Sequence, residues 1–261
     1  MSVSLIITTY NRPDALFLVL RSILCQTKLP DEVIIADDGS NNTTKNCIDN
    51  FKKLSKIKII HSWQDDKGFR AAKSRNKAIA KSSCDYIVIV DGDMILHSRF
   101  VEDHVNHAEH GFFVQGSRVL LSKDKTKQTL VDKDIKFYFF SKGLKNRKNS
   151  LYSSFLASIF KQKKMYLKSV RACNMGFFKK DSIDINGFNN DIEGWGREDS
   201  EFTNRLFNNG IYCKVIHFNI IQFHLWHENS TRTHLTLNDS ILQSTIDGKL
   251  KWCNSGLNKY L

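Results

Sequence analysis

The chain has 261 residues, of which 41% are hydrophobic, and a formal net charge of +12 at pH 7. This length can bury the core of one large α/β domain or two small ones, and the absence of a run of about eighteen apolar residues predicts no membrane-spanning helix. The amino terminus lacks the basic stretch of a secretory signal, and the six cysteines form no Cys-x-x-Cys pair, so we expect free thiols in a cytoplasmic protein.

The positive charge is concentrated in residues 135–180, which contain twelve lysines or arginines and no acidic residue. The rest of the chain is therefore neutral overall. A uniform spread of charge would favour a nucleic-acid-binding module, whereas a local basic strip is typical of a face that meets phosphates, anionic lipid or an acidic glycolipid. A solvated lysine-rich surface is the simpler alternative and stays open.

The first ninety residues alternate between two hydrophobic patterns. Apolar runs predict four strands, at residues 3–8, 32–36, 57–61 and 86–90. Helical spacing between them predicts three helices, one beginning at Pro13 and the others at residues 43–54 and 70–81. Strands that alternate with helices in this way indicate a doubly wound, mostly parallel sheet.

The second half of the chain has a less regular pattern. We expect helices at residues 98–110 and 198–208, and strands at residues 112–119 and 212–223. The basic region at 141–171 interleaves lysines with aromatic and aliphatic side chains, which indicates an amphipathic helix flanked by mobile loops. Residues 187–196 are rich in glycine and predict a loop. The stretch after residue 230 gives no clear prediction.

The strand at residues 86–90 ends in Asp91, Gly92 and Asp93. Ligands of open α/β sheets bind where the strands end at their carboxyl edge. The two carboxylates can turn toward one point if the chain bends at Gly92, and hard oxygen ligands suit Mg²⁺ or Mn²⁺ carrying a phosphorylated ligand. The alternative is an Asp-Gly-Asp turn without a ligand.

Other polar side chains follow the neighbouring strands. They are Thr9 and Tyr10 after the first strand, and Asp37 and Asp38 after the second. An aromatic ring with a carboxylate at one sheet edge suits a nucleotide base. Arg70, Arg75 and Asn76 precede the central strand and are expected to reach that base or a diphosphate. No Walker motif or Gly-x-Gly-x-x-Gly fingerprint occurs.

Four short motifs in this order resemble family 2 glycosyltransferases of the GT-A fold. They cover residues 6–12 (IITTYNR), 35–40 (IADDGS), 68–76 (GFRAAKSRN) and 90–93 (VDGD). Gly187-Phe188 and the later sequence GWGRED at 194–199 resemble the acceptor half of β-1,4-galactosyltransferases and of bacterial chondroitin-type polymerases. The resemblance extends from residue 3 to about 230. Thr8 stands where the family has proline, which is expected to change the turn rather than the activity.

The resemblance implies a donor site for a UDP-sugar. Its residues would be Thr9, Tyr10, Arg12, Asp37, Asp38, Arg70, Arg75, Asp91 and Gly92. The uridine would be held by Thr9, Tyr10, Arg70 and either Asp38 or its neighbour Asp37.

A bound Mn²⁺ or Mg²⁺ is the cofactor that the resemblance implies. Asp91 and Asp93 would form the DxD motif, and Asp93 is expected to be the principal ligand. A histidine after a late strand would complete the ligand set, and His224 and His227 compete for that role. We favour His224 because it directly follows the predicted strand, although a lone histidine is more often structural.

The acceptor site is expected at Trp195, Gly196, Glu198 and Asp199. An inverting transfer needs a general base for the acceptor hydroxyl. By resemblance Asp199 is that base and Glu198 binds an acceptor hydroxyl, while Trp195 between its glycines forms a mobile, stacking lid over a sugar. Acidic residues at a helix start are also common as caps, which is the alternative interpretation.

These observations together predict an α/β protein of the GT-A fold, a doubly wound, mostly parallel sheet with a C-terminal acceptor-binding lobe. Residues 1–95 would bind the nucleotide sugar, and residues 96–261 would bind the acceptor. The activity would be metal-dependent, inverting transfer of a hexose or N-acetylhexosamine from a UDP-sugar to a hydroxyl, forming a β-linkage.

The expected acceptor is a bacterial surface glycan or lipid-linked glycan, such as lipopolysaccharide, O-antigen or capsule. The basic strip would dock the protein peripherally on the anionic inner leaflet of the inner membrane, and no nucleic-acid partner is expected. A nucleotidyltransferase would share the sheet and the metal but not the acceptor motif, and a basic nucleic-acid-binding module would leave both acidic motifs unexplained. The donor sugar, the acceptor and the linkage position are not readable from the sequence.

Overall fold

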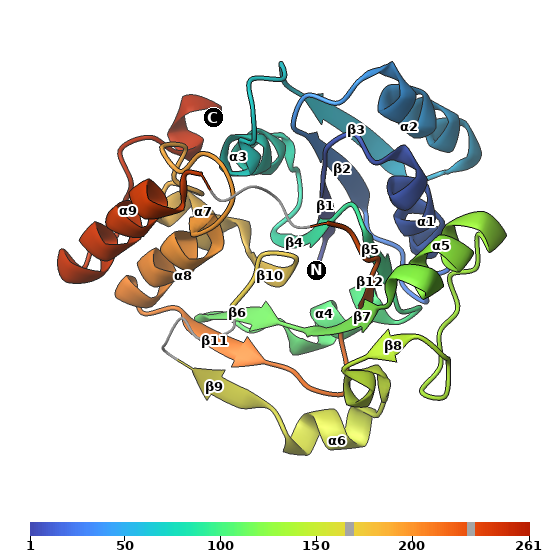
Figure 1. Ribbon diagram of the computed structural model, residues 1–261. Helices are drawn as coiled ribbons and strands as arrows, with labels where there is room; N and C mark the ends of the chain where they lie inside the picture. The colour runs from blue at the N-terminus through green and yellow to red at the C-terminus, as the bar shows by residue number, and fades with distance from the viewer. Residues whose placement is uncertain (165–169, 229–232) are drawn as a thin grey trace.

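The computed structural model describes residues 1–164, 170–228 and 233–261. In these residues an eight-stranded sheet has the order β3-β2-β1-β4-β10-β6-β11-β9, and a four-stranded sheet has the order β5-β12-β7-β8 (Figure 1). The expected α/β class with a large, mostly parallel sheet is confirmed.

The first half of the chain builds the parallel part of the large sheet. Its strands are β1 (Val3–Thr9), β2 (Glu32–Asp37), β3 (Lys58–Trp63) and β4 (Tyr86–Asp91). The register pairs Thr9 with Asp37 and Thr8 with Asp91. Because the strands are parallel and in register, the polar residues after each of them meet at one edge of the sheet.

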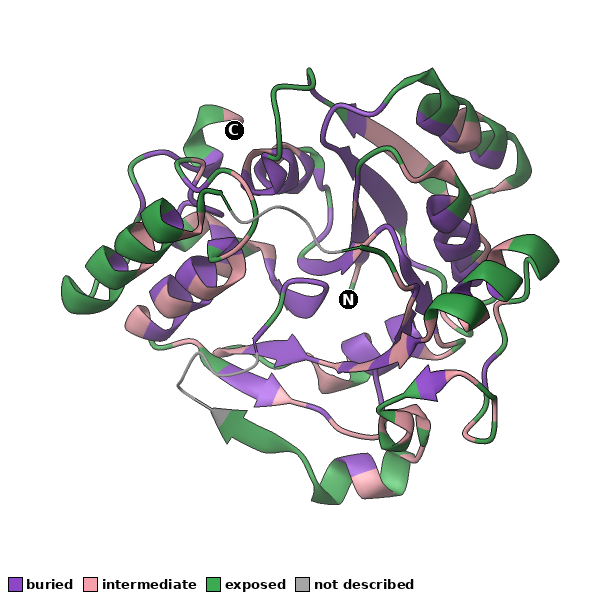
Figure 2. Ribbon diagram, viewed as in Figure 1, coloured by how far each residue is buried: buried purple, intermediate pink, exposed green. Residues whose placement is uncertain are grey.

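Helices cover both faces of this sheet. On one face, α1 (Pro13–Leu24), α2 (Asn42–Leu54) and α4 (Phe100–His107) pack against alternate strand residues such as Leu5 and Val88. On the other face, α3 (Ala71–Lys81) and α8 (Glu198–Asn208) pack against Ile6 and Ile87. The strands β1, β2 and β4 are accordingly buried on both sides (Figure 2), and the predicted helices and strands of this half are confirmed.

A strand that the sequence did not reveal joins the two halves of the chain. The strand β10 (Asn174–Phe178) lies antiparallel between β4 and β6 (Phe112–Gln115). The strand β11 (Tyr212–Val215) then runs parallel to β6, and β9 (Gln162–Lys164) pairs antiparallel with β11. Segments from the first ninety-five residues and from the rest of the chain therefore share one sheet.

Two of the expected long strands are divided between the two sheets. The run at 112–119 forms β6 and then, after Gly116, β7 (Ser117–Leu121); the run at 212–223 forms β11 and β12 (Ile221–His224). A side chain at Gly116 would lie 2.4 Å from the Ile220 side chain, so the two crossing segments pack closely there. The small sheet is completed by β5 (Met94–Leu96) and β8 (Leu144–Lys145).

The basic region does not form the expected single amphipathic helix. Its described residues form a short 3₁₀ turn, η1 (Arg147–Ser150), the helix α6 (Ser154–Ile159) and β9, while residues 165–169 of that prediction lie outside the described residues. The Ser153 side chain accepts from the Leu156 N–H and so caps the start of α6. After α6 the chain is extended, because β9 pairs with β11.

Further helices of the described residues were not predicted. They are α5 (Lys123–Asp132), α7 (Lys179–Asp184), α9 (Leu235–Asp247) and the 3₁₀ turn η2 (Leu257–Lys259). All six cysteines are free thiols, as expected. None of the described helices has the length and apolar character needed to cross a membrane.

Candidate active site

Unpaired polar atoms gather at the carboxyl edge of β1, β2 and β4. The Thr9 Oγ1, Gln64 Oε1, Arg70 Nε and Asp93 Oδ1 atoms are buried and have no hydrogen-bond partner among the described residues. Buried polar side chains are nearly always paired in folded proteins. Four such atoms at the edge where ligands of open α/β sheets bind indicate a site built for a polar ligand.

The carboxylates after β2 organise one side of this edge. The Arg70 N–H and the Gln64 side-chain amide both donate to Asp38, each at 2.6 Å. Asp37 is fully buried, accepts from the Ser40 N–H (2.8 Å) and lies 2.8 Å from His61 Nε2. The partners of Asp37 therefore give it a structural role. Asp38 instead orients Gln64 and Arg70, two of the residues that carry unpaired atoms.

The loop after β3, which contains Asp66, closes over the end of β2. The exposed Tyr10 donates its hydroxyl to Asp66 at 2.9 Å. Gly39 has a φ of +97°, and a side chain there would meet the Asp66 backbone at 2.5 Å, so the loop packs on a position that only glycine fits. Gln64, at the start of this loop, was missed by the sequence analysis because glutamine carries no distinctive motif.

A second group of side chains surrounds Asp93 and could hold a metal ion. Its Oδ2 atom lies 3.5 Å from His224 Nε2 and 3.4 Å from His227 Nε2, and one ligand atom from each of the three residues falls within 4.8 Å of the others. The pairing of β12 with β5 sets His224 opposite Met94, next to Asp93. Both histidines that competed for this role are thus brought to the same carboxylate.

The donor set at Asp93 fits a divalent cation. Burial opposes ionisation of this carboxyl, but the charges and hydrogen bond of His224, Arg12 and His227 hold its pKa below the usual value. Arg12 Nη1 lies 2.7 Å from Oδ2, while Oδ1 is one of the unpaired buried atoms. One carboxylate with two imidazoles suits Mn²⁺ better than Mg²⁺, which prefers oxygen ligands.

Asp91 has a different environment from Asp93. Its Oδ1 atom lies 3.2 Å from Arg75 Nη2, and it is not part of the group formed by Asp93 and the two histidines. Arg75 also lies 3.2 Å from Asp199 and 3.4 Å from Glu198, so one guanidinium faces three carboxylates. The sequence predicted neither this position for Asp91 nor these partners for Arg75.

Arg75 is the charged centre of this group. Its side chain is only 5% exposed, and although burial opposes its charge, the three carboxylates raise its pKa above the usual value. Its Nε also donates to Thr8 Oγ1 at 3.2 Å. Thr8 lies inside β1, so the expected change of turn is not found, and the threonine instead helps to orient Arg75.

The neighbouring Asn76 does not reach a base or a diphosphate, and that expectation is wrong. It is fully buried, its amide donates to the Phe188 carbonyl (2.7 Å), and its Oδ1 accepts from the Phe188 N–H (2.8 Å). Asn76 therefore ties α3 to the loop that leads to α8.

The start of α8 presents the two candidate acceptor-side carboxylates. Gly196 and Arg197 both have positive φ angles, +102° and +80°, which turn the chain sharply into the helix at Glu198. Asp199 Oδ2 accepts from the Ala172 N–H at 2.9 Å. Burial and the charge of Asp199 raise the pKa of Glu198 to about 7.

The loop that carries the exposed Trp195 is held from two sides. The Asn238 amide, on α9, donates to the Glu193 carbonyl (2.9 Å) and the Gly196 carbonyl (3.0 Å), while the Gly194 N–H donates to the Phe69 carbonyl (2.8 Å). A cavity of about 300 Å³ lies between Trp195, Phe69 and residues of the loop before α9. The Trp195 loop is thus held between the Phe69 segment and α9.

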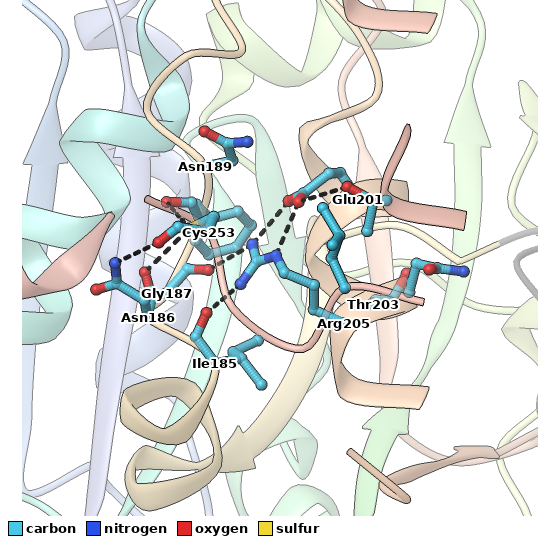
Figure 3. A network of polar contacts seen from close by, with 12 residues as sticks. Ile185, Asn186, Gly187, Asn189, Glu201, Thr203, Arg205 and Cys253 are labelled. Atoms are coloured by element: carbon cyan, nitrogen blue, oxygen red, sulfur yellow. Dashed lines mark hydrogen bonds and ion pairs between the residues drawn. The ribbon is translucent and has the colours of Figure 1, made fainter. Parts of the chain in front are cut away.

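A buried ion pair fixes the position of α8. The fully buried Arg205 donates to both carboxylate oxygens of Glu201, at 2.8 and 2.7 Å, and to the carbonyls of Ile185 and Gly187 (Figure 3). Thr245, on α9, donates to the same Glu201. This network therefore joins the helix of Glu198 and Asp199 to the Gly187 turn and to α9.

Replacing Arg205 by methionine is expected to lower the free energy of unfolding by about 3–5 kcal/mol, because it leaves the Glu201 charge buried without a partner. Denaturant unfolding measures this difference. The double variant Glu201→Leu/Arg205→Met removes the buried charge and should recover part of the loss. A single variant within about 1 kcal/mol of the parent would show that the network does not hold α8.

Comparisons with known proteins agree with this geometry. A model described as "Glycosyl transferase family 2" matches residues 4–169, and one described as "N-terminal domain of galactosyltransferase" matches residues 155–228. These ranges include the residues at the carboxyl edge of β1, β2 and β4 and the carboxylates at the start of α8. Both parts of the resemblance expected from the sequence motifs are confirmed.

Among similar proteins are two bacterial synthases. A chondroitin synthase of Escherichia coli is 26% identical over 236 residues, covering 82% of this chain and 33% of the synthase. A hyaluronan synthase of Pasteurella multocida is 27% identical over 246 residues, covering 83% of this chain and 24% of the synthase. The chain thus spans about a quarter to a third of the length of these relatives.

A solved structure has the same fold. It is S. aureus TarS 1-349 in complex with UDP, which is 16% identical to this chain with a TM-score of 0.60. The match covers 93% of this chain and 64% of the TarS chain. The expected GT-A fold is confirmed by this likeness.

Proposed function

Because the chain belongs to glycosyl transferase family 2 and is therefore a glycosyltransferase, we propose that it catalyses an inverting, metal-dependent transfer from a UDP-sugar to a glycan hydroxyl. The observation that carries this proposal is the position of Arg75. It pairs with Asp91 at the end of β4 and with Glu198 and Asp199 at the start of α8. The candidate base is therefore next to the sheet edge where the donor would bind.

The donor is a UDP-hexose or UDP-N-acetylhexosamine. Thr9 and Arg70 each carry one of the unpaired buried atoms, Asp38 accepts from the Arg70 N–H, and Tyr10 follows Thr9 at the same sheet edge. A polar nucleotide would satisfy the unpaired atoms. The UDP bound to TarS, a protein of the same fold, supports the same donor class here.

Asp93, His224 and His227 would hold Mn²⁺ in preference to Mg²⁺. Such an ion, when bound, neutralises the charge that develops on the leaving diphosphate. Arg12, which contacts Asp93, adds a fixed positive charge on the same side of the site. Asp91 contributes indirectly, because it orients Arg75.

Asp199 takes the proton of the attacking acceptor hydroxyl as the sugar is transferred. The Ala172 N–H and Arg75 fix its two oxygens in place, so the carboxylate is oriented before the acceptor arrives. Glu198 binds an acceptor hydroxyl, and its raised pKa of about 7 allows it to donate a hydrogen bond near neutral pH. Trp195 would stack on a sugar ring.

The acceptor is a bacterial surface glycan, and the product carries the new sugar in a β-linkage. Two relatives are named as bacterial synthases of chondroitin and hyaluronan, which supports a polysaccharide acceptor. Residues 1–95 would bind the donor and residues 96–261 the acceptor.

The direct test of this function is release of UDP from a panel of UDP-hexoses and UDP-N-acetylhexosamines, with Mn²⁺ and with EDTA. We expect at least one donor to release UDP in Mn²⁺ and none in EDTA. Failure of every donor in the panel would overturn the proposal, and equal rates in EDTA would overturn its metal dependence.

Membrane docking would use the surface of α6 and β9. Phe155 and Phe160 are 73% and 52% exposed, and Lys161 and Lys163 beside them are also exposed. Much of α6 and β9 is coloured as exposed in Figure 2. Apolar side chains that enter the headgroup region, next to lysines that attract anionic lipid, are typical of peripheral membrane proteins. The protein would therefore lie on the anionic inner leaflet, where lipid-linked acceptors are found.

The protein is expected to sediment with vesicles that contain anionic lipid, and less so as the salt concentration rises. Replacing Lys161 and Lys163 by glutamine should weaken this binding, since each lysine near the surface contributes about 1 kcal/mol. The matched control replaces Lys52 and Lys53, on α2, and should bind as the parent does. Equal binding to neutral vesicles, or none to either kind, would refute the docking role.

A further inference from the structure

A second cavity, distinct from the one beside Trp195, lies where the chain passes from β6 to β7. Its volume is about 270 Å³, and Arg118 and Arg171 are among the residues that line it. This size is slightly below the roughly 300–1,000 Å³ of ordinary ligand sites and suits a single sugar unit. We call it the β6–β7 cavity.

The floor of the β6–β7 cavity is rigid. The Gln115 amide donates to the Asn174 carbonyl (2.8 Å), and Gln115 Oε1 accepts from the Arg171 N–H (2.9 Å). The Asn174 amide in turn donates to the carbonyls of Ser117 (3.1 Å) and Ile220 (3.0 Å). The cavity is therefore formed in advance of any ligand, which limits the entropy lost on binding.

The β6–β7 cavity adjoins the candidate base. Arg171 and Cys173 line it, and the N–H of Ala172 between them donates to Asp199. Burial raises the pKa of the Cys173 thiol to about 12, with Asp91 and Asp199 adding to this effect and Arg118 and Arg171 opposing it. The two carboxylates and the two guanidinium groups thus all lie close enough to Cys173 to affect its ionisation, which places the cavity arginines near the candidate base.

The two arginines of the β6–β7 cavity have no acidic partner. Neither guanidinium forms an ion pair within the described ranges, and Arg118 Nη1 has only a long contact of 4.0 Å with Cys173 Sγ. No lining residue is an aspartate or glutamate. Arg118 is half-buried and Arg171 is exposed, so both guanidinium groups lie at the wall of the cavity and are open to a ligand from solvent. Two arginines without an acidic partner beside a preformed polar cavity favour an anion, since arginine matches the geometry of carboxylate and phosphate oxygens.

We propose that the β6–β7 cavity binds an anionic group of the acceptor, through Arg118 and Arg171, and so selects a negatively charged glycan. The group is a carboxylate or a phosphate on the sugar unit that carries the attacking hydroxyl, or on the next unit. This inference rests on the proposed function, because it places the acceptor beside Asp199. Binding of the anion also positions the attacking hydroxyl, because the covalent structure of the acceptor fixes the distance between the two groups.

The test compares charged acceptors with their neutral counterparts, using the full chain and a donor that releases UDP in Mn²⁺. One pair is an oligosaccharide ending in glucuronic acid and its carboxyl-reduced form ending in glucose. The other is a polyol-phosphate oligomer and the free polyol. We expect one of the charged acceptors to have a kcat/KM about 10–100-fold above its neutral counterpart, and which pair responds identifies the anion.

The Arg118→Gln and Arg171→Gln variants are expected to remove this preference by raising the KM of the charged acceptor, with little change for the neutral one. Arg21→Gln, on α1, is the matched control and should keep the preference. If the arginines only offset the charges of Asp91 and Asp199, both acceptors of a pair would change equally, and the inference would be wrong. Equal kcat/KM within both pairs for the parent protein would also overturn it.

UDP release without an acceptor separates this inference from the proposed function. A parent protein that releases UDP in Mn²⁺ but shows no preference for charge retains its proposed activity and loses only the anion site. No UDP release from any donor would contradict the activity itself. The arginine variants should release UDP as the parent does, because Arg118 and Arg171 are not part of the donor site.

Discussion

An Asp199→Asn variant is expected to lose about 10²–10⁴-fold in kcat, with little change in UDP affinity. Asparagine keeps the shape of the side chain but cannot accept the proton of the acceptor hydroxyl. Of the candidate donor residues Arg75 contacts Asp199, while the others lie at the ends of β1, β2 and β4 or just before α3, so UDP binding should be largely preserved. Steady-state kinetics and calorimetric UDP binding on the same protein measure both effects.

Two further variants distinguish catalysis from helix capping. Glu198→Gln should raise the acceptor KM more than it lowers kcat, because Glu198 is expected to bind a hydroxyl. The control is Asp124→Asn, which changes an exposed aspartate in the first turn of α5. It measures the loss of an acidic residue at a helix start that is not part of the candidate site. A cap alone contributes about 1 kcal/mol to stability. An Asp199→Asn protein that melts earlier yet turns over normally would rule out Asp199 as the base.

An Asp93→Ala variant is expected to abolish transfer and to weaken Mn²⁺ binding by more than about 100-fold. Even residues that only orient metal ligands cost 10–100-fold in metal affinity when they are replaced, and Asp93 would be a ligand. UDP affinity should fall in Mn²⁺ but not in EDTA, because a metal ion held by Asp93 would offset the negative charge of the diphosphate. Electron paramagnetic resonance of free Mn²⁺ measures the first effect and calorimetry the second.

The matched control is Asp85→Ala, at the opposite end of β4, which should bind Mn²⁺ as the parent does. Replacement of His224 or His227 by alanine should weaken Mn²⁺ binding separately, since both lie within 3.5 Å of Asp93 Oδ2. Full activity of Asp93→Ala, or unchanged Mn²⁺ affinity, would exclude this group as the metal site.

The first half of the chain was predictable because its signals are local. The strands β1, β2 and β4 are continuous apolar runs, and parallel pairing brings whatever follows them to one edge. The positions of Thr9, Asp38 and Asp93 at that edge follow from this pairing alone.

The second half was less predictable because its strands depend on distant partners. β10 follows a basic region and has no alternating pattern, yet it lies in the centre of the sheet because β4 and β6 both pair with it. The strand at 112–119 was expected to be continuous, but Gly116 allows a close crossing that sends its second part to another sheet. Tertiary pairing of this kind leaves no periodicity in the sequence.

Within the site, the residue types were predicted but not all of their partners. Nothing in the sequence around Arg75, on α3, predicts that it contacts Asp91, Glu198 and Asp199. These three residues lie 16 to 124 positions away in the chain. The sequence likewise does not predict the role of Asn238, whose amide donates to the carbonyls on both sides of the Trp195 loop. Such contacts are fixed by the packing of α8 and α9.

The stereochemistry of the first sugar released tests the inverting mechanism most directly. A UDP-hexose carries its sugar in α-linkage, and water can replace the glycan acceptor, so no knowledge of the natural acceptor is needed. Proton NMR during hydrolysis in Mn²⁺, recorded before the anomers equilibrate, measures which anomer forms first. We expect the β-anomer from the parent protein and a much slower reaction from Asp199→Asn. Initial release of the α-anomer would contradict an inverting transfer with Asp199 as its base.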